Sequence, residues 1–300
     1  MSNRLFIGTE GGLHTLNGDA AVRIEGRKVS HVAQGENGWY AVVDRSEVWR
    51  SGDGRDWSVL ATVEHRTLNC VVSVSGDLYV GTSNAHVYKM RDGELGQVES
   101  FDGTEGQETW HTPWGGPPDV RSMSADSSGT LFANVHVGGI PRSSDGGVTW
   151  EPTVPVESDV HEVFCDRDSG TVLAAAAIGL GVSDDGGATW RWDSDGVHGR
   201  YMRAAAVAGE TVLASASTGP YSDKAAVYRK GLGNSGPFRK CEHGLPDWFS
   251  DNIDSMCLAA RGSFAAFGTA DGRMYASDDA GESWTLAAEG LPPVRCVAIG

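Results

Sequence analysis

The sequence predicts an all-β protein, a single seven-bladed β-propeller over residues 1–300, built from four-stranded blades. Three observations predict it: a turn motif that recurs along the chain, an inner-strand pattern that recurs seven times, and strand-like segments at the two ends that complete one blade. The 41 glycines suit a fold with many turns. No apolar run approaches the roughly 20 residues that a membrane-spanning helix needs.

The turn motif is Ser-x-Asp-x-Gly-x-Thr/Ser-Trp. It is complete at residues 143–150, 183–190 and 277–284, and a shorter copy without the second glycine lies at residues 51–57. Asp and Ser side chains can bond the backbone N–H groups of a tight turn, and glycine supplies the positive φ that the turn requires. The Trp that follows can bury its ring between neighbouring sheets. Each copy therefore predicts a hairpin between two strands of one blade.

A second pattern predicts the number of blades. Each unit begins with an apolar residue followed by a polar one, and these starts are 39 to 52 residues apart, the length of a four-stranded blade. The starts are Val29, Leu68, Val120, Val160, Met202, Ile253 and Val294. The segment 5–9 has the composition of a second strand. We therefore expect residues 294–300 to complete the first blade as its innermost strand, which leaves no open edge.

The turn motif resembles the Asp-box, or BNR repeat, of sialidases, the sortilin family and YVTN/BNR-like propellers, which include photosystem assembly factors. The resemblance covers most of the chain as a repeat and implies the propeller fold. It implies no single activity, because these families have unrelated functions. It also implies that the motif joins the third and fourth strands, on the face opposite the usual binding site. We therefore expect its carboxylates to be structural.

Composition excludes several classes of function. The formal net charge of −16 argues against a nucleic-acid partner, because phosphate neutralisation needs a basic surface, and against a membrane partner with anionic lipid. The N-terminal segment has no apolar signal region and no small-residue cleavage site, so we expect a cytoplasmic location. The five cysteines form no Cys-x-x-Cys pair, which is typical of buried thiols in a reducing compartment and not of a zinc site.

The second residue of each inner-strand segment predicts a ligand site, since it should lie at the mouth of the central channel. These residues are Ser30, Asn69, Arg121, His161, Arg203, Asp254 and Arg295. These positions hold three arginines and a histidine but only one carboxylate, so the local charge is opposite in sign to the net charge of the protein. Because arginine forks suit carboxylate, phosphate or sulfate, the three arginines and Asp254 are candidate ligand-binding residues. The alternative is that the arginines pair with Asp119, Glu162 and Asp254 and fill the channel.

Three long loops are expected on the same face. They span residues 109–119, 217–224 and 244–252. Trp114, Tyr221 and Trp248 are candidates for stacking on a sugar ring or another planar ligand, and His111 is a further ligand-binding candidate. The alternative is that the rings pack the loops as small cores.

Histidines expected on this face are the candidates for metal or acid–base chemistry. His136, His161 and His198 are weak candidates for a divalent metal, because no His-x-His or His-x-x-x-His spacing exists and a site would have to assemble in space. The candidate catalytic residues are His161, His136, Glu162, Tyr201 and Asp119, without assigned roles. Hydrogen bonding within the loops is the leading alternative.

The sequence thus supports three functions. The first is a propeller that binds an anionic small molecule or saccharide at the channel mouth. The second is an enzyme, either a lyase using histidine and a metal or a glycoside hydrolase resembling sialidases. In a sialidase-like site, the three arginines would take the place of the arginine triad that binds the substrate carboxylate. Tyr201 or Tyr221, activated by Glu162, would be the nucleophile, and Asp119 would be the acid. The Phe/Tyr-Arg-Ile-Pro signature of sialidases is absent, however. The third is a scaffold for protein assembly, with a protein partner.

Overall fold

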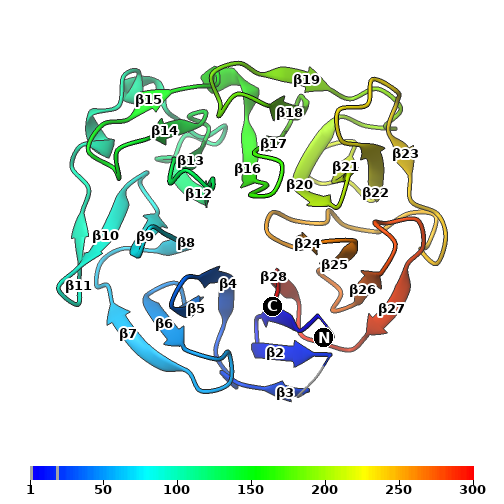
Figure 1. The fold of residues 1–300 in the computed structure, drawn as a ribbon, viewed down its shortest axis with the longest axis horizontal. Helices are drawn as coiled ribbons and strands as arrows, with labels where there is room; N and C mark the ends of the chain where they lie inside the picture. The colour runs from blue at the N-terminus through cyan, green and yellow to red at the C-terminus, as the bar shows by residue number, and fades with distance from the viewer. Residues whose placement is uncertain (1–2, 18–19) are drawn as a thin grey trace.

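The protein is described by a computed structural model over residues 3–17 and 20–300. Its strands form seven four-stranded antiparallel sheets that stand as blades around a central axis (Figure 1). The fold is therefore an all-β, seven-bladed β-propeller, as the sequence predicts. In the described part of the chain, no helix is long and apolar enough to cross a bilayer.

The blades follow one another along the chain, and each is numbered from its innermost strand outward. The first blade contains β28 (Val294–Ile299), β1 (Leu5–Thr9), β2 (Gly12–Leu16) and β3 (Ala21–Val22); the second, β4 (Val29–Gly35), β5 (Gly38–Val43), β6 (Glu47–Ser51) and β7 (Ser58–Thr62); the third, β8 (Leu68–Val74), β9 (Asp77–Thr82), β10 (Val87–Arg91) and β11 (Glu94–Gln97). The fourth contains β12 (Asp119–Ala125), β13 (Leu131–His136), β14 (Pro141–Ser143) and β15 (Glu151–Pro152); the fifth, β16 (Val160–Cys165), β17 (Val172–Ala176), β18 (Gly179–Ser183) and β19 (Arg191–Asp193). The sixth contains β20 (Tyr201–Ala208), β21 (Thr211–Ser217), β22 (Ala225–Gly231) and β23 (Arg239–Lys240); the seventh, β24 (Leu258–Arg261), β25 (Phe264–Gly268), β26 (Met274–Ser277) and β27 (Thr285–Ala288). Three single turns of 3-10 helix, η1 (Phe101–Gly103), η2 (Gln107–Thr109) and η3 (Val156–Ser158), lie in the loops.

The two ends of the chain meet in the first blade. β28 pairs antiparallel with β1, with Ile299 opposite Leu5 and Cys296 opposite Gly8. Beyond the strands, the N–H of Gly300 donates to the carbonyl of Arg4 at 2.8 Å. This pairing confirms the expected closure, and Figure 1 shows the red and blue strands side by side. The ring therefore has no unpaired inner edge at its seam.

The core lies between neighbouring blades. Every residue of the second strands β1, β13, β17 and β25 is buried, because both faces of each sheet pack against the next blade. These strands consequently read as continuous apolar runs and not as an alternation of apolar and polar residues. Small residues fill the narrow space near the axis, as in the Ala174–Ala176 run of β17.

The turn motif joins the third and fourth strands of its blades. In the seventh blade, Ser277 Oγ accepts the N–H of Gly281 at 2.9 Å and donates to Asp279 Oδ1 at 2.8 Å. Asp279 also accepts the N–H and hydroxyl of Ser283, at 2.9 and 2.6 Å. These donors lower the pKa of Asp279 to about 2. Gly281 has a φ of 82°, the positive value that the turn requires.

The tryptophan of the motif packs against its own blade or against the loop of a neighbouring one. Trp284 is 3% exposed and meets Phe267 edge to face, with ring centroids 4.9 Å apart. Trp150 meets Phe101 of η1 in the same way, also at 4.9 Å. The motif therefore closes the hairpin between two strands with its own side chains, a unit that we call the lock. In the fourth blade, its tryptophan also packs against the loop that follows the third blade.

Removing the buried hydroxyl of this lock should destabilise the protein. In Ser277→Ala the buried N–H of Gly281 loses its acceptor, so the free energy of unfolding should fall by about 1–3 kcal/mol. The control is Ser283→Ala, which removes an exposed hydroxyl of the same turn and should change stability by no more than about 0.5 kcal/mol. Urea unfolding measures both, and equal effects would contradict the role assigned to Ser277.

Candidate functional site

A β-bulge interrupts the inner strand of six blades at the position expected to lie at the channel mouth. In β4, Val29 pairs with Val43 and His31 with Val42, which leaves Ser30 without a cross-strand partner. The same irregularity occurs at Asn69, Arg121, His161, Arg203 and Arg295. A bulge inserts an extra residue and turns its side chain out of the regular sheet. The polar second position that the sequence singles out is therefore a bulge position in six blades.

In the seventh blade the register expected from the sequence is wrong. The inner strand β24 begins at Leu258 and not at Ile253. The carbonyl of Cys257 accepts the N–H of Gly268 at 2.9 Å, which is the pairing that the residue after the bulge makes in the third blade. Met256, and not Asp254, therefore holds the bulge position. It has a φ of 63°.

The segment 254–256 crosses the channel. The N–H of Met256 donates to Glu162 Oε2 of β16 at 2.7 Å, and its carbonyl accepts the N–H of Val297 of β28 at 2.8 Å. Ser255 Oγ donates to the carbonyl of His161 at 3.2 Å. β16 and β28 face each other across the ring in Figure 1. We call this segment the crossbar; it separates the space at the channel mouth from the space below.

Above the crossbar lies a polar cavity of about 320 Å³, which we call the mouth cavity. It is lined by Lys28, Ser30, Arg45, Asn69, Asp119, Arg121, Arg203, Asp254, Ser255, Met256, Val294 and Arg295. Because inner strands begin here and third strands end at the other face, the mouth cavity lies opposite the turn motifs. The three candidate arginines and the carboxylates Asp119 and Asp254 thus gather around one space. Its described lining holds five cationic side chains and two carboxylates, the reverse of the overall charge.

Two of the three arginines have partners within the protein. Arg203 forms an ion pair with Asp254 at 2.5 Å and lies over the ring of Tyr201. Arg295 forms an ion pair with Glu10 at 2.6 Å, and Lys28 also contacts Glu10, at 2.9 Å. The pairing of Arg203 with Asp254 is one of the pairs expected from the sequence, whereas the pairing of Arg295 with Glu10 is not.

Arg121 has neither a hydrogen bond nor an ion pair to any described residue. Its guanidinium is half-buried in the wall of the mouth cavity. Burial lowers the pKa of Arg121, and the positive charge of Arg203 lowers it further, against the opposing effect of Asp254 and Asp119. A guanidinium carries five donors, and leaving them unsatisfied away from water is unfavourable. Among the described cations of the lining, Arg121 alone has no hydrogen-bond partner, while Arg45 bonds only the amide oxygen of Asn69 and has no carboxylate partner.

The candidate nucleophile of a sialidase-like site is not assembled. Glu162 is 6% exposed and lines a cavity of about 210 Å³ below the crossbar, and burial raises its pKa to about 8. The Tyr201 ring packs against His161 at 4.5 Å, and its hydroxyl contacts Arg203 at 3.4 Å. Tyr221 is 99% exposed. Among the described residues, neither tyrosine is paired with Glu162.

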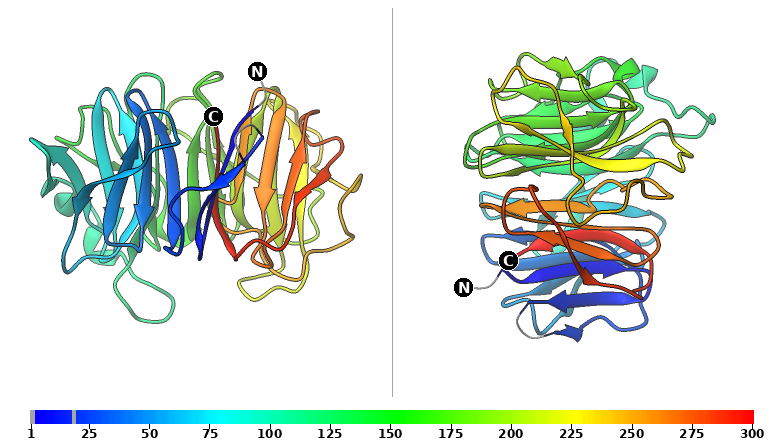
Figure 2. Two further views of the ribbon diagram at one scale, coloured as in Figure 1. Left: turned by 90° about the horizontal axis from the view of Figure 1, so that it is seen from below. Right: turned by 90° about the vertical axis from the view of Figure 1, so that its right-hand side faces the viewer.

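The aromatic candidates lie outside the mouth cavity. Figure 2 shows long loops projecting from one face of the disc. Trp114 is 70% exposed and stacks near His136, with ring centroids 5.5 Å apart. Trp248 packs against the ring of His198 at 4.4 Å and beneath the ammonium group of Lys240. The Trp248 ring therefore holds its loop against neighbouring segments. This agrees with the alternative that the aromatic rings pack the loops.

The remaining histidine candidates make local hydrogen bonds. His111 is exposed, and its Nδ1 lies 3.0 Å from the carbonyl of Thr109. Both ring nitrogens of His198 are engaged, Nδ1 with the Tyr228 hydroxyl at 2.8 Å and Nε2 with the Lys224 carbonyl at 3.0 Å. Neither residue joins His136 and His161.

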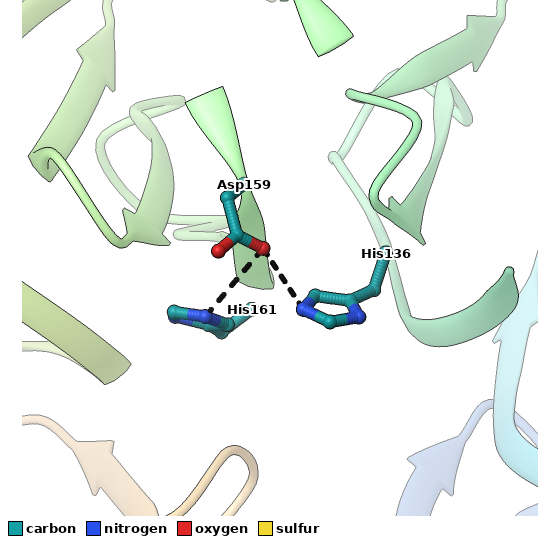
Figure 3. A group of neighbouring side chains, drawn as sticks. All are labelled: His136, Asp159 and His161. Carbon is teal, nitrogen blue, oxygen red and sulfur yellow. Dashed lines mark ion pairs between the residues drawn. The ribbon is translucent and has the colours of Figure 1, made fainter. Parts of the chain in front are cut away.

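His136 and His161 converge instead on Asp159, a residue that the sequence analysis missed (Figure 3). His136 ends β13, and Asp159 immediately precedes β16, whose bulge carries His161. Asp159 Oδ1 lies 2.8 Å from His136 Nε2 and 3.7 Å from His161 Nε2. Burial lowers the pKa of His161 to about 4. Burial raises the pKa of Asp159, but the two histidines outweigh it and the net shift is downward.

No protein-family model matches the chain, and no curated protein matches it. Solved structures do resemble it. YCF48 bound to a D1 peptide has a TM-score of 0.60 and 14% identity, over 95% of this chain and 85% of that one. An ancestral GH74 enzyme has a TM-score of 0.62 and 14% identity, over 99% of this chain and 40% of that one.

A third similar structure is the GH74 xyloglucanase from Xanthomonas campestris. It has a TM-score of 0.61 and 16% identity, over 95% of this chain and 46% of that one. The chain thus spans less than half the length of both GH74 proteins. At these identities the similarity establishes the propeller fold alone.

The buried Glu162 predicts a pH dependence of stability. Its pKa is raised to about 8 in the folded protein from an ordinary value of 4.5, so the folded state holds an extra proton between these values. Stability should therefore fall as pH rises from 5 to 8, by up to about 1.4 kcal/mol per pH unit from this group.

Glu162→Gln retains an acceptor for the Met256 N–H but cannot ionise, so its stability curve should be flatter over that range. Glu36→Gln, at an exposed position, should follow the wild type. Urea unfolding at several pH values measures the difference, and parallel curves for all three proteins would refute the assignment.

Proposed function

We propose that the protein binds a small anionic molecule, such as a sugar acid or another carboxylate, in the mouth cavity. The observation that carries the proposal is the partnerless guanidinium of Arg121. It faces a space whose described lining carries more positive than negative charge, in a protein of net charge −16. A carboxylate or phosphate would accept its donors as a fork and relieve its repulsion with Arg203.

The size of the cavity favours a compact ligand. At about 320 Å³ it lies near the lower end of the range for small-molecule sites, roughly 300–1,000 Å³. The hydroxyl of Ser30 in the wall has no partner among the described residues and can hydrogen bond to a polyhydroxylated molecule, whereas both ends of the Asn69 amide are already bonded, to Arg45 and to the carbonyl of Val120. These properties suit one acidic sugar unit better than a long polymer.

The paired residues of the wall suit recognition of the same ligand. Asp254 neutralises Arg203, and Glu10 neutralises Arg295. These pairs hold their guanidinium groups in place, while Arg121 remains available. The hydrogen-bond donors of Arg121 are therefore the ones most open to an anionic ligand in the cavity.

Binding is favoured over glycoside hydrolysis by the position of Glu162. This carboxyl lines the space below the crossbar and not the mouth cavity, so it cannot assist a tyrosine there. The Asp-box resemblance of the turn motifs, on the opposite face, supports a scaffold role for them. The xyloglucanase and the peptide-bound YCF48 share this fold, so a saccharide and a peptide of a partner protein are both conceivable ligands of such a propeller.

The proposal predicts that Arg121→Ala weakens ligand binding without loss of stability. Loss of a charged hydrogen-bonding partner should weaken anion binding by about 10- to 150-fold. Without ligand, the variant should be at least as stable as the wild type, because the removed charge has no partner and is repelled by Arg203. Calorimetric titration with glucuronate, galacturonate, phosphate and sulfate measures affinity, with neutral glucose as the ligand control.

Arg55→Ala removes an exposed arginine outside the cavity and should bind as the wild type does. Equal binding by Arg121→Ala and the wild type would refute the proposal. So would a lower stability of the unliganded variant, which would give Arg121 a structural role. Failure of every small anion, together with binding of an acidic peptide, would favour the assembly scaffold.

A further inference from the structure

We propose that His136, Asp159 and His161 form a binding site for one divalent transition-metal ion, of which Zn²⁺ is the reference. The site is separate from the mouth cavity and does not depend on the proposed anion binding. One potential ligand atom from each residue lies within 4.8 Å of the other two. Figure 3 shows one nitrogen of each imidazole ring beside the same carboxylate oxygen of Asp159.

The spacing is close to that of a metal centre. Bonds of about 2.0–2.2 Å to nitrogen and oxygen in tetrahedral geometry place neighbouring ligand atoms about 3.3 Å apart. The separations from Asp159 Oδ1, 2.8 Å to His136 Nε2 and 3.7 Å to His161 Nε2, lie on either side of that value. The two histidine nitrogens lie within 4.8 Å of each other, so the two rings would have to move closer together to seat an ion.

Two of the atoms are buried without a hydrogen-bond partner among the described residues. They are Nε2 of His161, a residue with no exposed surface, and Oδ1 of Asp159. Oδ1 keeps an ion-pair contact with His136 Nε2 at 2.8 Å, whereas Nε2 of His161 has no close partner in the described chain. Buried polar atoms in folded proteins nearly always have a partner, so the unpartnered Nε2 of His161 indicates a missing occupant.

The tautomer of His161 is set for metal binding. Its Nδ1 lies 2.6 Å from the carbonyl oxygen of Met202, which can only accept, so Nδ1 carries the proton. Nε2 then carries the lone pair, and Asp159 Oδ1 lies 3.7 Å from it, beyond hydrogen-bond distance. A backbone carbonyl that holds the distal nitrogen of a histidine is the usual support of a metal ligand. A cation between Nε2 and Oδ1 would replace the repulsion of two lone pairs with two bonds.

The ligand set selects the class of ion. Two imidazoles and one carboxylate suit Zn²⁺ and its neighbours in the first transition series, and they do not suit Ca²⁺ or Mg²⁺, which prefer oxygen. Three protein ligands leave at least one coordination position for water or another ligand. Arg121 acts electrostatically on both Asp159 and His161, which opposes cation binding but favours an anion on a bound metal.

Calorimetric titration of the chelator-treated wild type with Zn²⁺, and separately with Mg²⁺, tests the site. We expect one Zn²⁺ per chain, no comparable Mg²⁺ binding, and at least a 10-fold loss of Zn²⁺ affinity in Asp159→Asn and in His161→Ala. His65→Ala removes a histidine whose side chain is 93% exposed and should bind Zn²⁺ as the wild type does. The visible spectrum of the Co²⁺-substituted protein should show nitrogen and oxygen coordination, and Asp159→Asn should lose it.

Zinc soaked into wild-type crystals gives a readout that needs no variant, should His161→Ala fail to fold. An anomalous peak between the two rings of the site would support the proposal. Absence of a peak at saturating Zn²⁺ would overturn it. So would Zn²⁺ binding that Asp159→Asn and His161→Ala retain but His65→Ala reduces, which would mean an adventitious surface ion only.

Discussion

The pairing of β28 with β1 is the interaction on which the other features depend. It joins the last strand of the chain to the first sheet and closes the ring. Closure brings seven inner strands to one axis, and the bulges of these strands therefore open onto a common space. In an open stack of the same blades, Arg121 and Arg295 would lie on distant surfaces. The mouth cavity is thus a product of closure and not of any single blade.

The charge at the mouth follows from the geometry of the bulge. A bulge residue leaves the sheet, so it can be large and polar without disturbing the packing between blades. In six blades the position holds serine, asparagine, histidine or arginine, and in the seventh it holds Met256. Lys28, Arg203 and Arg295 are paired with carboxylates, whereas Arg45 bonds only a neutral amide and Arg121 has no described partner, so the residual positive charge lies on Arg45 and Arg121. A ligand site in this fold can therefore change in specificity while the core between the blades stays the same.

Much of the fold could be predicted because its signals are repeated. Three complete turn motifs and seven inner-strand starts each give evidence for the same architecture, and one irregular copy does not alter it. The register of the seventh blade failed because Ile253–Asp254–Ser255 has the same apolar–polar order as a true inner-strand start. The cysteine that follows the bulge residue at Cys70 and Cys296 also occurs at Cys257, and this signal places Met256 at the bulge.

The site was less predictable because it depends on loops and on contacts between blades. The convergence of the arginines followed from the repeat, since each occupies an equivalent position. Asp159 precedes its inner strand and has no repeated counterpart in the pattern, so only the folded chain brings it to His136. The exposure of Tyr221 and the packing of Trp248 against His198 depend on how each loop folds over its neighbours, which strand periodicity does not encode.

The crossbar determines from which side a ligand can reach the mouth cavity. Since residues 254–256 bond to β16 on one side and β28 on the other, the axis of the disc is a dead end and not a passage. A molecule in the mouth cavity must therefore enter and leave from the same face of the propeller. The long loops that rim that face would then govern its residence time as well as its entry, and the opposite face would have no part in the exchange.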